Sequence, residues 1–599
     1  MGGIVSVIDQ SGRCPGRSWL GGMAKVAPGR GALKIAEWPG ACLGVQSHGA
    51  SLYSEAAGGV ALDGYLTRAT ELRRQLHAVA DVHSDAELVW HAWCAFGDSA
   101  WERFHGSFAL VLLDRERRSV RWTRSLDGLR PLHFAQHGGA LAFASEMAQI
   151  AALPGLSVRI HRESFIERLW GDSQTLDPVA TEIRPILRVP PPAVFGAVAG
   201  ATSGYSEIAA HWQPPEPDHT VSIDQVCSQL TGLLDTAVRE HWPDDEAGLC
   251  LSGGLDSTTI GAFAGDAGLP LRTYSMVFPG APNDEREYIE IMTGRLGVPS
   301  RMIDMSQERP AAYFDRLSRL DFIPGAQTDY QVDVLARALQ ADGVRYWVDG
   351  VGGDFTLTGF IYYLADRFRA GRWLSAVLDT IGRLDPYARL RSPRLLAHRF
   401  YAAIVAPPGS GMWLRRSVRG SIDWLAESAR EVALDAAAQL RRLVRHHGYA
   451  RAFRLALVQA WGTGQGNALV EQLTARFGLQ TRSPLLDQAL IDHAFRVPDE
   501  LLLFGRQDKG ALRRTMRNRL PSAITARRAA TRHDSVARHG ADFLERLGST
   551  STWRLVEFDL LNRTELDHAV DRCQTLGQID RHLYRLLRAE AWLDRWIGS

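Results

Sequence analysis

The spacing of apolar residues in the middle of the chain predicts strands that alternate with helices. Residues 225–240 carry apolar side chains at helical spacing, and the short apolar run 248–251 leads through a glycine-rich turn into a second helical stretch from Ser257. Residues 271–278 and 345–348 are two further short apolar runs of the kind that form buried strands. Strands separated by helical stretches favour a parallel sheet with crossover helices. We therefore predict an α/β fold for this part of the chain.

The first part of the chain has a different pattern, in which short apolar runs predominate. Residues 108–113 and 140–143 have the length and composition of buried strands. Residues 85–96 have helical spacing and follow Ser84, a residue type that caps helix N-termini. This pattern predicts a sheet-rich α+β domain.

Two proline-rich stretches mark the end of this first region. Residues 189–192 and 213–217 resist both a helix and a central strand, because proline lacks the backbone N–H and fixes φ. We therefore expect a domain boundary near residue 218, which gives domains of residues 1–218 and 219–599. From about residue 360 onward, the pattern of the second domain is overwhelmingly helical.

Composition and charge narrow the possible partners. The 599 residues include 68 Lys plus Arg against 67 Asp plus Glu, a formal net charge of +1, so no long-range field attracts nucleic acid or an anionic membrane. The six cysteines include no C-x-x-C pair, no run of roughly 18 apolar residues occurs, and the start has no basic n-region. These features predict a cytoplasmic protein. Basic residues are nearly all arginine, and the lysines are Lys25, Lys34 and Lys509.

The segment L-S-G-G-L-D-S at 251–257 joins a predicted strand to a predicted helix and is the strongest candidate for chemistry. Successive backbone N–H groups and a helix N-terminus that point at one spot bind anions such as pyrophosphate. The loop has no lysine, unlike the phosphate loop of kinases and GTPases, so a cation must come from elsewhere. Asp256 is a candidate Mg²⁺ ligand, because Mg²⁺ prefers carboxylate and phosphate oxygens. The predicted nucleotide-binding residues of this loop are Leu251, Ser252, Gly253, Gly254, Leu255, Asp256 and Ser257.

A second glycine-rich loop, residues 349–354, follows another predicted strand and ends at Asp354. Loops at the carboxyl ends of parallel strands converge on one crevice, so we expect Asp256 and Asp354 to bind the same metal ion. Asp349 and Gly350 are further predicted nucleotide contacts. ATP and Mg²⁺ are thus the predicted cofactors. Mg²⁺ on the β- and γ-phosphates makes pyrophosphate a good leaving group when a carboxylate attacks the α-phosphorus. The loops therefore predict an AMP-forming carbon–nitrogen ligase that works through an acyl-adenylate.

The chain resembles the glutamine-dependent asparagine synthetase family over nearly its whole length. Besides the S-G-G-L-D-S loop, residues 471–500 resemble the family's E-x-R-x-P-x-L-D segment, with Arg482, Pro484, Leu486 and Asp487 in the matching places. The resemblance implies a Rossmann-like ATP-pyrophosphatase (HUP) domain with a largely helical C-terminal part. It also implies ATP contacts at Leu251, Val277 and Gly350.

The first region resembles the glutaminase domain of the same family at 84–87, 106–109, 124–132 and 143–146. This implies an Ntn-hydrolase-like sandwich. A glutaminase of this type uses a cysteine directly after the initiator methionine, whereas this chain begins Met1-Gly2-Gly3, so no side chain can attack glutamine there. The family's Asn-Gly-Glu element is also changed, to Asp63-Gly64-Tyr65. We expect a degenerate glutaminase that serves as a scaffold.

Two positions of the second domain also depart from the family. Val351 stands where asparagine synthetases carry a glutamate, and Val351 offers no proton acceptor. The place of the family's catalytic lysine falls near Ala529, so Arg528 or Arg532 is the candidate for that cationic role.

A ligase without an ammonia source must receive its amine with the substrate, as β-lactam synthetases and lasso peptide cyclases do. We expect a lasso peptide cyclase that adenylates an Asp or Glu side chain of a precursor peptide and joins it to the peptide's α-amine as an isopeptide macrolactam. A leader-binding protein and a cysteine protease would be its pathway partners. A β-lactam-type synthetase, an ammonia-using asparagine synthetase and a non-catalytic ATP-binding homologue remain alternatives.

Overall fold

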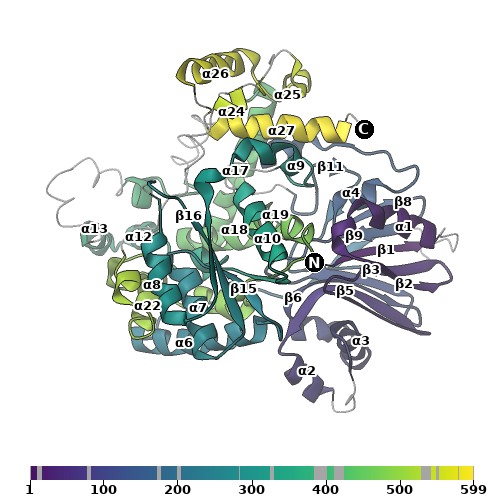
Figure 1. The fold of residues 1–599 in the computed structure, drawn as a ribbon, viewed down its shortest axis with the longest axis horizontal. Helices are drawn as coiled ribbons and strands as arrows, with labels where there is room; N and C mark the ends of the chain where they lie inside the picture. The colour runs from purple at the N-terminus through teal and green to yellow at the C-terminus, as the bar shows by residue number, and fades with distance from the viewer. Residues whose placement is uncertain are drawn as a thin grey trace.

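The computed structural model describes residues 2–9, 16–76, 82–170, 177–198, 204–281, 283–323, 329–382, 401–410, 424–463, 465–527, 541–544, 546–547, 552–577, 579 and 581–597. Figure 1 shows an antiparallel sandwich at the N-terminal end beside a parallel sheet that is surrounded by helices. Both parts agree with the classes that the apolar pattern predicted.

The N-terminal domain contains two six-stranded antiparallel sheets packed face to face. The ring of Trp122 in one sheet lies 5.4 Å from that of Phe134 and 5.1 Å from that of Phe143 in the other. The first sheet has the order β12-β8-β9-β1-β3-β2, with β1 (Gly3–Asp9), β2 (Leu33–Trp38), β3 (Ala41–Gln46), β8 (His133–His137), β9 (Ala140–Ala144) and β12 (Leu187–Arg188). The second has the order β14-β13-β7-β6-β5-β4, with β4 (Ala50–Glu55), β5 (Gly58–Thr67), β6 (His105–Asp114), β7 (Ser119–Arg124), β13 (Ala193–Val198) and β14 (Ser206–Ala210).

Helices cover the outer faces of this sandwich (Figure 1). The Ser84 hydroxyl accepts a hydrogen bond from the Glu87 backbone N–H at 3.2 Å and so caps the N-terminus of α3, as the sequence predicted. The helices are α1 (Arg17–Val26), α2 (Ala69–Gln75), α3 (Asp85–Phe96), α4 (Met147–Ala151) and α5 (Arg162–Trp170), and a small ribbon pairs β10 (Arg159–Ile160) with β11 (Ile183–Arg184).

The second domain is built on a five-stranded parallel sheet of order β17-β16-β15-β18-β19. Its strands are β15 (Ala247–Cys250), β16 (Leu271–Val277), β17 (Ser300–Asp304), β18 (Tyr346–Val348) and β19 (Gln480–Arg482). The helices that connect or flank them include α6 (Ile223–His241), α7 (Leu255–Asp266), α8 (Arg286–Leu296) and α10 (Asp329–Ala341). The predicted helix 225–240 and the three predicted strands fall on α6, β15, β16 and β18, while α7 begins two residues before Ser257.

The described residues in the rest of the second domain are mostly helical, as the pattern after residue 360 predicted, and β19 is a strand among them. The helices in this part and in the loops that precede it are α9 (Phe314–Leu317), α11 (Gly353–Thr356), α12 (Tyr363–Arg369), α13 (Trp373–Gly382), α17 (Glu427–His447), α18 (Tyr449–Thr463), α19 (Gln465–Ala475), α20 (Gln488–Arg496), α21 (Asp499–Leu502), α22 (Gly510–Thr515), α23 (Ser522–Thr525), α24 (Ala541–Leu544), α25 (Arg554–Glu557), α26 (Arg563–Leu576) and α27 (Arg581–Ile597). None of the helices in the described part of the chain is long and apolar enough to cross a membrane.

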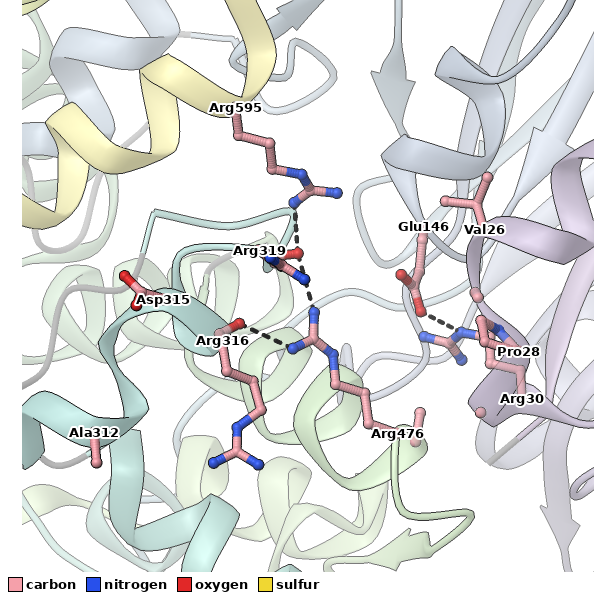
Figure 2. Close-up of a pocket in the computed structure, with 13 residues that line it drawn as sticks. Val26, Pro28, Arg30, Glu146, Ala312, Asp315, Arg316, Arg319, Arg476 and Arg595 are labelled. Atoms are coloured by element: carbon pink, nitrogen blue, oxygen red, sulfur yellow. Dashed lines mark hydrogen bonds and ion pairs between the residues drawn. The ribbon is translucent and has the colours of Figure 1, made fainter. Parts of the chain in front are cut away.

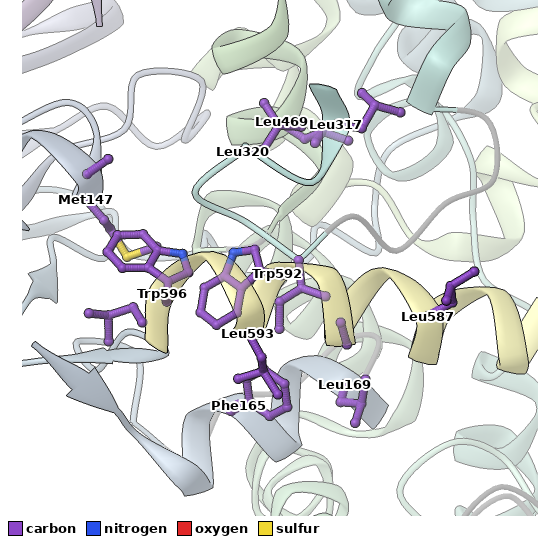
Figure 3. Close-up of a cluster of buried hydrophobic side chains, with 14 of the residues drawn as sticks. Met147, Phe165, Leu169, Leu317, Leu320, Leu469, Leu587, Trp592, Leu593 and Trp596 are labelled. Carbon is purple, nitrogen blue, oxygen red and sulfur yellow. The ribbon is translucent and has the colours of Figure 1, made fainter. Parts of the chain in front are cut away.

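The C-terminal helix α27 joins the two domains through a shared core (Figure 3). The ring of Trp592 on α27 lies 5.8 Å from the ring of Phe165 on α5, and Met147 of the N-terminal domain belongs to the same buried cluster. The expected boundary near residue 218 lies between β14 and α6. Because α27 packs on residues before that point, the two domains share apolar core across it.

Candidate functional site

The loop 251–257 leaves the carboxyl end of β15 and leads into α7. The Ser252 backbone N–H donates to the Ser257 hydroxyl at 3.0 Å, and the Gly254 N–H donates to the Ser252 hydroxyl at 3.2 Å. The Ser257 hydroxyl in turn lies 3.2 Å from the Ser252 carbonyl oxygen. The two serines thus close the loop on itself, which fixes the glycine-rich backbone at the N-terminus of α7.

The second loop, after β18, packs directly against the first. A Cβ atom at Gly350 would lie 3.0 Å from the Ser257 backbone nitrogen, and one at Gly353 would lie 2.4 Å from Cγ of Asp256. Glycine is therefore required at Gly353 for the loops to approach this closely. The structure brings together the two loops that the parallel-sheet argument placed in one crevice.

Lys509 lies between the two predicted metal ligands. Its ammonium group is 2.5 Å from Oδ2 of Asp256 and 2.7 Å from Oδ1 of Asp354. Burial lowers the pKa of Lys509, but the two carboxylates outweigh that effect and raise it overall. Burial also raises the pKa of Asp256, an effect that Lys509 opposes. Lys509 is therefore a cation held at the loop that has no lysine of its own.

The carboxylate oxygens of Asp256 and Asp354 are suitable ligands for a magnesium ion that also binds substrate phosphates. Oδ1 of Asp256 is a buried oxygen with no hydrogen-bond partner among the described residues, and the Asp354 side chain is 90% exposed. No group of three or more His, Cys, Asp or Glu side chains suited to a metal occurs among the described residues. Mg²⁺ commonly takes one or two protein carboxylates and fills its octahedron with water and phosphate oxygens.

An arginine from the C-terminal part of the chain braces the first loop. Arg527 donates to the Gly253 carbonyl oxygen at 2.9 Å and to the Glu285 carboxylate at 2.6 Å. Glu285 in turn accepts from the Gly253 N–H at 3.0 Å. The Arg527 guanidinium also lies 4.4 Å from the centre of the Tyr288 ring. Sequence reasoning missed Arg527, Glu285 and the placement of Lys509, and the scarcity of lysine was the signal that could have indicated Lys509.

Asp349, Val277 and Leu251 are buried beside these loops. The Asp349 carboxylate accepts from the Ser483 hydroxyl and the Trp347 indole N–H, both at 2.7 Å, and from the Val351 N–H at 3.1 Å. These hydrogen bonds link the Asp349 carboxylate to β18, to the residue after β19 and to the second loop. A nucleotide contact at Asp349 would therefore come from its backbone. The predicted catalytic residues Arg528 and Arg532, and also Ala529, lie outside the described residues.

Gly2, at the position where the resemblance would place a glutaminase cysteine, is enclosed by its neighbours. A Cβ atom at Gly2 would lie 2.5 Å from Cβ of Ala50 and 2.6 Å from the Gln46 carbonyl oxygen. The Gly2 carbonyl oxygen accepts a 2.6 Å hydrogen bond from Arg30. No side chain fits at Gly2 without a shift of the neighbouring backbone.

Arg30 connects this position to the second domain. It forms two hydrogen bonds to the Glu471 carboxylate, at 2.7 and 2.9 Å, and one to Glu146 at 2.6 Å. Arg30 and Glu471 are both fully buried. Asp63, from the altered Asn-Gly-Glu element, is also buried, and neither of its oxygens has a hydrogen-bond partner among the described residues.

Two glycine-rich loops at the ends of parallel strands, joined to an antiparallel sandwich with glycine at position 2, define a two-domain protein with a candidate nucleotide site in its α/β half. Comparison with known families identifies it further. Residues 229–594 match the asparagine synthase family, and residues 41–206 match the glutamine amidotransferase domain. The chain therefore belongs to the asparagine synthase family, whose members are ATP-dependent amide ligases.

Similarity to individual proteins is modest. The chain is 22% identical to "Asparagine synthetase [glutamine-hydrolyzing] 3" of Bacillus subtilis over 536 residues, 85% of this chain and 81% of that one. It is 24% identical to "Amidase chry2" of Gibberella zeae over half of this chain and 46% of the other. Among solved structures, the glutamine PRPP amidotransferase of B. subtilis covers 58% of this chain at 14% identity, with a TM-score of 0.25, which is too low to carry an argument.

Proposed function

We propose that this protein is an AMP-forming lasso peptide cyclase. It adenylates an Asp or Glu side chain of a precursor peptide, and the peptide's own α-amine then displaces AMP to close an isopeptide macrolactam. The precursor peptide is the substrate, and a leader-binding protein and a cysteine protease are the proposed partners of the same pathway.

The observation that carries the proposal is the combination of an enclosed backbone at Gly2, in the N-terminal domain, with two complete glycine-rich loops in the second domain. Glutamine hydrolysis in this domain type needs a nucleophilic side chain, and Gly2 neither has one nor leaves room for one. The loop 251–257 meanwhile keeps its serine contacts, its Arg527 brace and Asp256. A chain that retains the activation site and lacks the ammonia site is consistent with an amine that is delivered by the substrate.

The residues at the loops have separate tasks in this scheme. The backbone N–H groups of the first turn of α7 bind the β- and γ-phosphates, since those of Ser252, Gly253 and Gly254 already donate to Ser257, Glu285 and Ser252. Asp256 and Asp354 would hold Mg²⁺, which supplies charge neutralisation on pyrophosphate as it leaves. Lys509 supplies a further positive charge, and Arg527 keeps the loop in its binding shape. The carboxylate of the peptide attacks the α-phosphorus, and pyrophosphate departs with the electron pair of the broken P–O bond.

The choice of amine separates this proposal from its alternatives. Val351 packs beside a cluster of apolar side chains, so that position offers no proton acceptor to an incoming amine. The similarity to asparagine synthetase over most of the chain favours an ammonia-using enzyme as the second candidate. A β-lactam-type synthetase and a non-catalytic ATP-binding homologue are the remaining two.

The test is a product assay with purified protein, MgATP and a choice of acceptor. Candidate core peptides are compared with aspartate plus ammonia, and AMP, pyrophosphate and the mass of the peptide are measured. The proposal expects AMP, pyrophosphate and a peptide that has lost one water. Asparagine formation would support the second candidate, and ATP binding without AMP from any acceptor would support a non-catalytic homologue.

A matched pair of variants controls this assay. Asp256→Asn removes a carboxylate at the loop, whereas Asp244→Asn changes an exposed aspartate before β15. Cyclisation should be lost in the first variant and retained in the second. Cyclisation that survives Asp256→Asn would show that the loop is not the activation site.

A further inference from the structure

A cavity of about 860 Å³ lies between the domains, and none of its lining residues belongs to the nucleotide loops. Its walls come from the turn after α1, from Glu146 before α4, from residues 312–319, from the end of α19 and from α27. Ligand pockets typically measure ~300–1,000 Å³, so this cavity is large enough for a small molecule.

Arginine side chains dominate one wall of this cavity. Figure 2 shows Arg319, Arg476 and Arg595 drawn together around the backbone of residues 316–320. Arg476 donates to the carbonyl oxygens of Arg316 and Arg319, both at 3.0 Å. Arg595 donates to the carbonyl oxygens of Arg319 at 2.5 Å and Leu320 at 2.9 Å. Arg316, Arg319, Arg476 and Arg595 all line this wall, and the Arg316 guanidinium is paired at 3.2 Å with the buried carboxylate of Asp333.

The carboxylates nearby do not balance these charges. Glu146 is bound to Arg30, and Asp315 is bound at 2.8 and 3.3 Å to Arg546. Asp321 lies 3.6 Å from Arg595 and is its counterion, because a carboxyl group whose pKa burial raises to about 6 is still largely ionised at neutral pH. These carboxylates thus already have cationic partners, and the excess positive charge of the wall is that of Arg319 and Arg476, neither of which has a carboxylate at ion-pair distance among the described residues.

Arg476 is an example of an arginine in this wall that lacks a carboxylate counterion at ion-pair distance among the described residues. Its hydrogen bonds go to the neutral carbonyl oxygens of Arg316 and Arg319, and burial lowers the pKa of its guanidinium although Glu146 and Asp321 oppose that shift. A guanidinium has five N–H donors, so Arg476 retains donors beyond these two. Arg319 is exposed, and its side chain makes no hydrogen bond or ion pair to other described residues. The hydrogen bonds to carbonyl oxygens hold the side chains of Arg476 and Arg595 in place, whereas the Arg319 side chain has no such structural role among the described residues.

We propose that this cavity binds a small organic anion that carries at least two carboxylate or phosphate groups. Guanidinium groups match the geometry of both oxyanions and form charge-assisted hydrogen bonds with them. The bound anion would contact Arg319 and Arg476, with Arg595 of α27 beside it. Since the opposite wall belongs to the N-terminal domain, the ligand would bridge the two domains at a site separate from that of ATP.

The test measures binding without ATP or Mg²⁺, with citrate as the carboxylate probe and fructose 1,6-bisphosphate as the phosphate probe. Calorimetry at constant ionic strength should give saturable binding of at least one probe, and the monoanion acetate should give none. Arg319→Glu should weaken that binding at least tenfold. Arg118→Glu, a charge reversal at an exposed arginine in the turn between β6 and β7, should leave it unchanged.

Two results would overturn this inference. One is the absence of saturable binding by either probe, and the other is binding that Arg319→Glu leaves unchanged. Circular dichroism and the melting temperature in plain buffer establish that the variant is folded. If Arg319→Glu does not fold, Arg319→Gln serves the same comparison, because it removes the charge and keeps a polar side chain.

Discussion

Replacement of Lys509 by methionine tests the central residue of the proposed nucleotide site. Methionine keeps most of the length and the apolar stem of lysine and removes only the ammonium group, which lies 2.5 Å from Asp256 and 2.7 Å from Asp354. We expect MgATP binding and stability both to decrease. In the proposed site the ammonium group attracts the phosphate oxygens, and it is also the counterion of the largely buried carboxylate of Asp256.

The magnitude follows from the exposure of the partners. A hydrogen bond to a charged group contributes about 1.5–3 kcal/mol, which corresponds to a loss of about 10- to 100-fold in MgATP affinity. The Lys509 and Asp256 side chains are 14% and 20% exposed, so their pair lies between a surface pair, worth about 0–1 kcal/mol, and a buried pair, whose disruption costs about 3–5 kcal/mol. The contact with Asp354, which is 90% exposed, contributes little. We expect a loss of about 2 kcal/mol in the free energy of unfolding.

Calorimetric titration with MgATP measures the affinity, and urea denaturation measures the stability. Lys34→Met is the matched control, because Lys34 is an exposed lysine on β2, in the other domain. MgATP affinity within threefold of wild type in a folded Lys509→Met protein would refute the assignment of Lys509 as the cation of the loop. An equal loss in Lys34→Met would attribute the effect to general charge rather than to this site.

Three further predictions use other parts of the molecule. Gly2→Cys should not restore glutamine hydrolysis. It should lower the free energy of unfolding by about 1–3 kcal/mol, because its Cβ would lie 2.5 Å from that of Ala50. Release of glutamate from glutamine by that variant would contradict the enclosure of Gly2. Arg527→Ala should weaken MgATP binding by about 10-fold by freeing the Gly253 carbonyl, and unchanged affinity in a titration would show that the loop keeps its shape unaided. Burial lowers the pKa of His133 to about 3, so its neutral form stabilises the fold above about pH 6.5, and that contribution declines by about 1.4 kcal/mol per pH unit as the pH falls towards 3. Urea denaturation between pH 7.5 and 5 should therefore show a steeper loss of stability in wild type than in His133→Gln, and parallel curves would argue against it.

The sequence predicted that two glycine-rich loops would follow parallel strands and lie close together, because the glycine pattern and the position after strands are local properties. The glycines at 253, 350 and 353 and the carboxylates of Asp256 and Asp354 follow from the residue pattern and the rule for parallel sheets. The cation could not be predicted in the same way. Lys509 is 253 positions after Asp256, and only the folded chain shows that its ammonium group lies between the two carboxylates.

The division into two domains shows the same limit. Proline-rich stretches and the change of apolar pattern predicted a boundary near residue 218, and each side has the predicted class of sheet. The periodicity of α27 indicates a helix but does not indicate its partner. The contact of Trp592 with Phe165 depends on tertiary packing, so the shared core became visible only in the structure.

The Arg30–Glu471 pair connects the N-terminal domain to the second domain through a buried ion pair. Glu471 is a fully buried carboxylate of the second domain, and Arg30 provides two hydrogen bonds to it from the first domain. Removal of one partner from a buried pair costs about 3–5 kcal/mol, because the other charge remains without a counterion. Glu471 lies on α19, and four residues separate the end of this helix from β19. Through β19 it is linked to the sheet whose strands β15 and β18 carry the two glycine-rich loops. The N-terminal domain is therefore part of the structure that supports the two glycine-rich loops, and removal of Arg30 is expected to destabilise the second domain through Glu471.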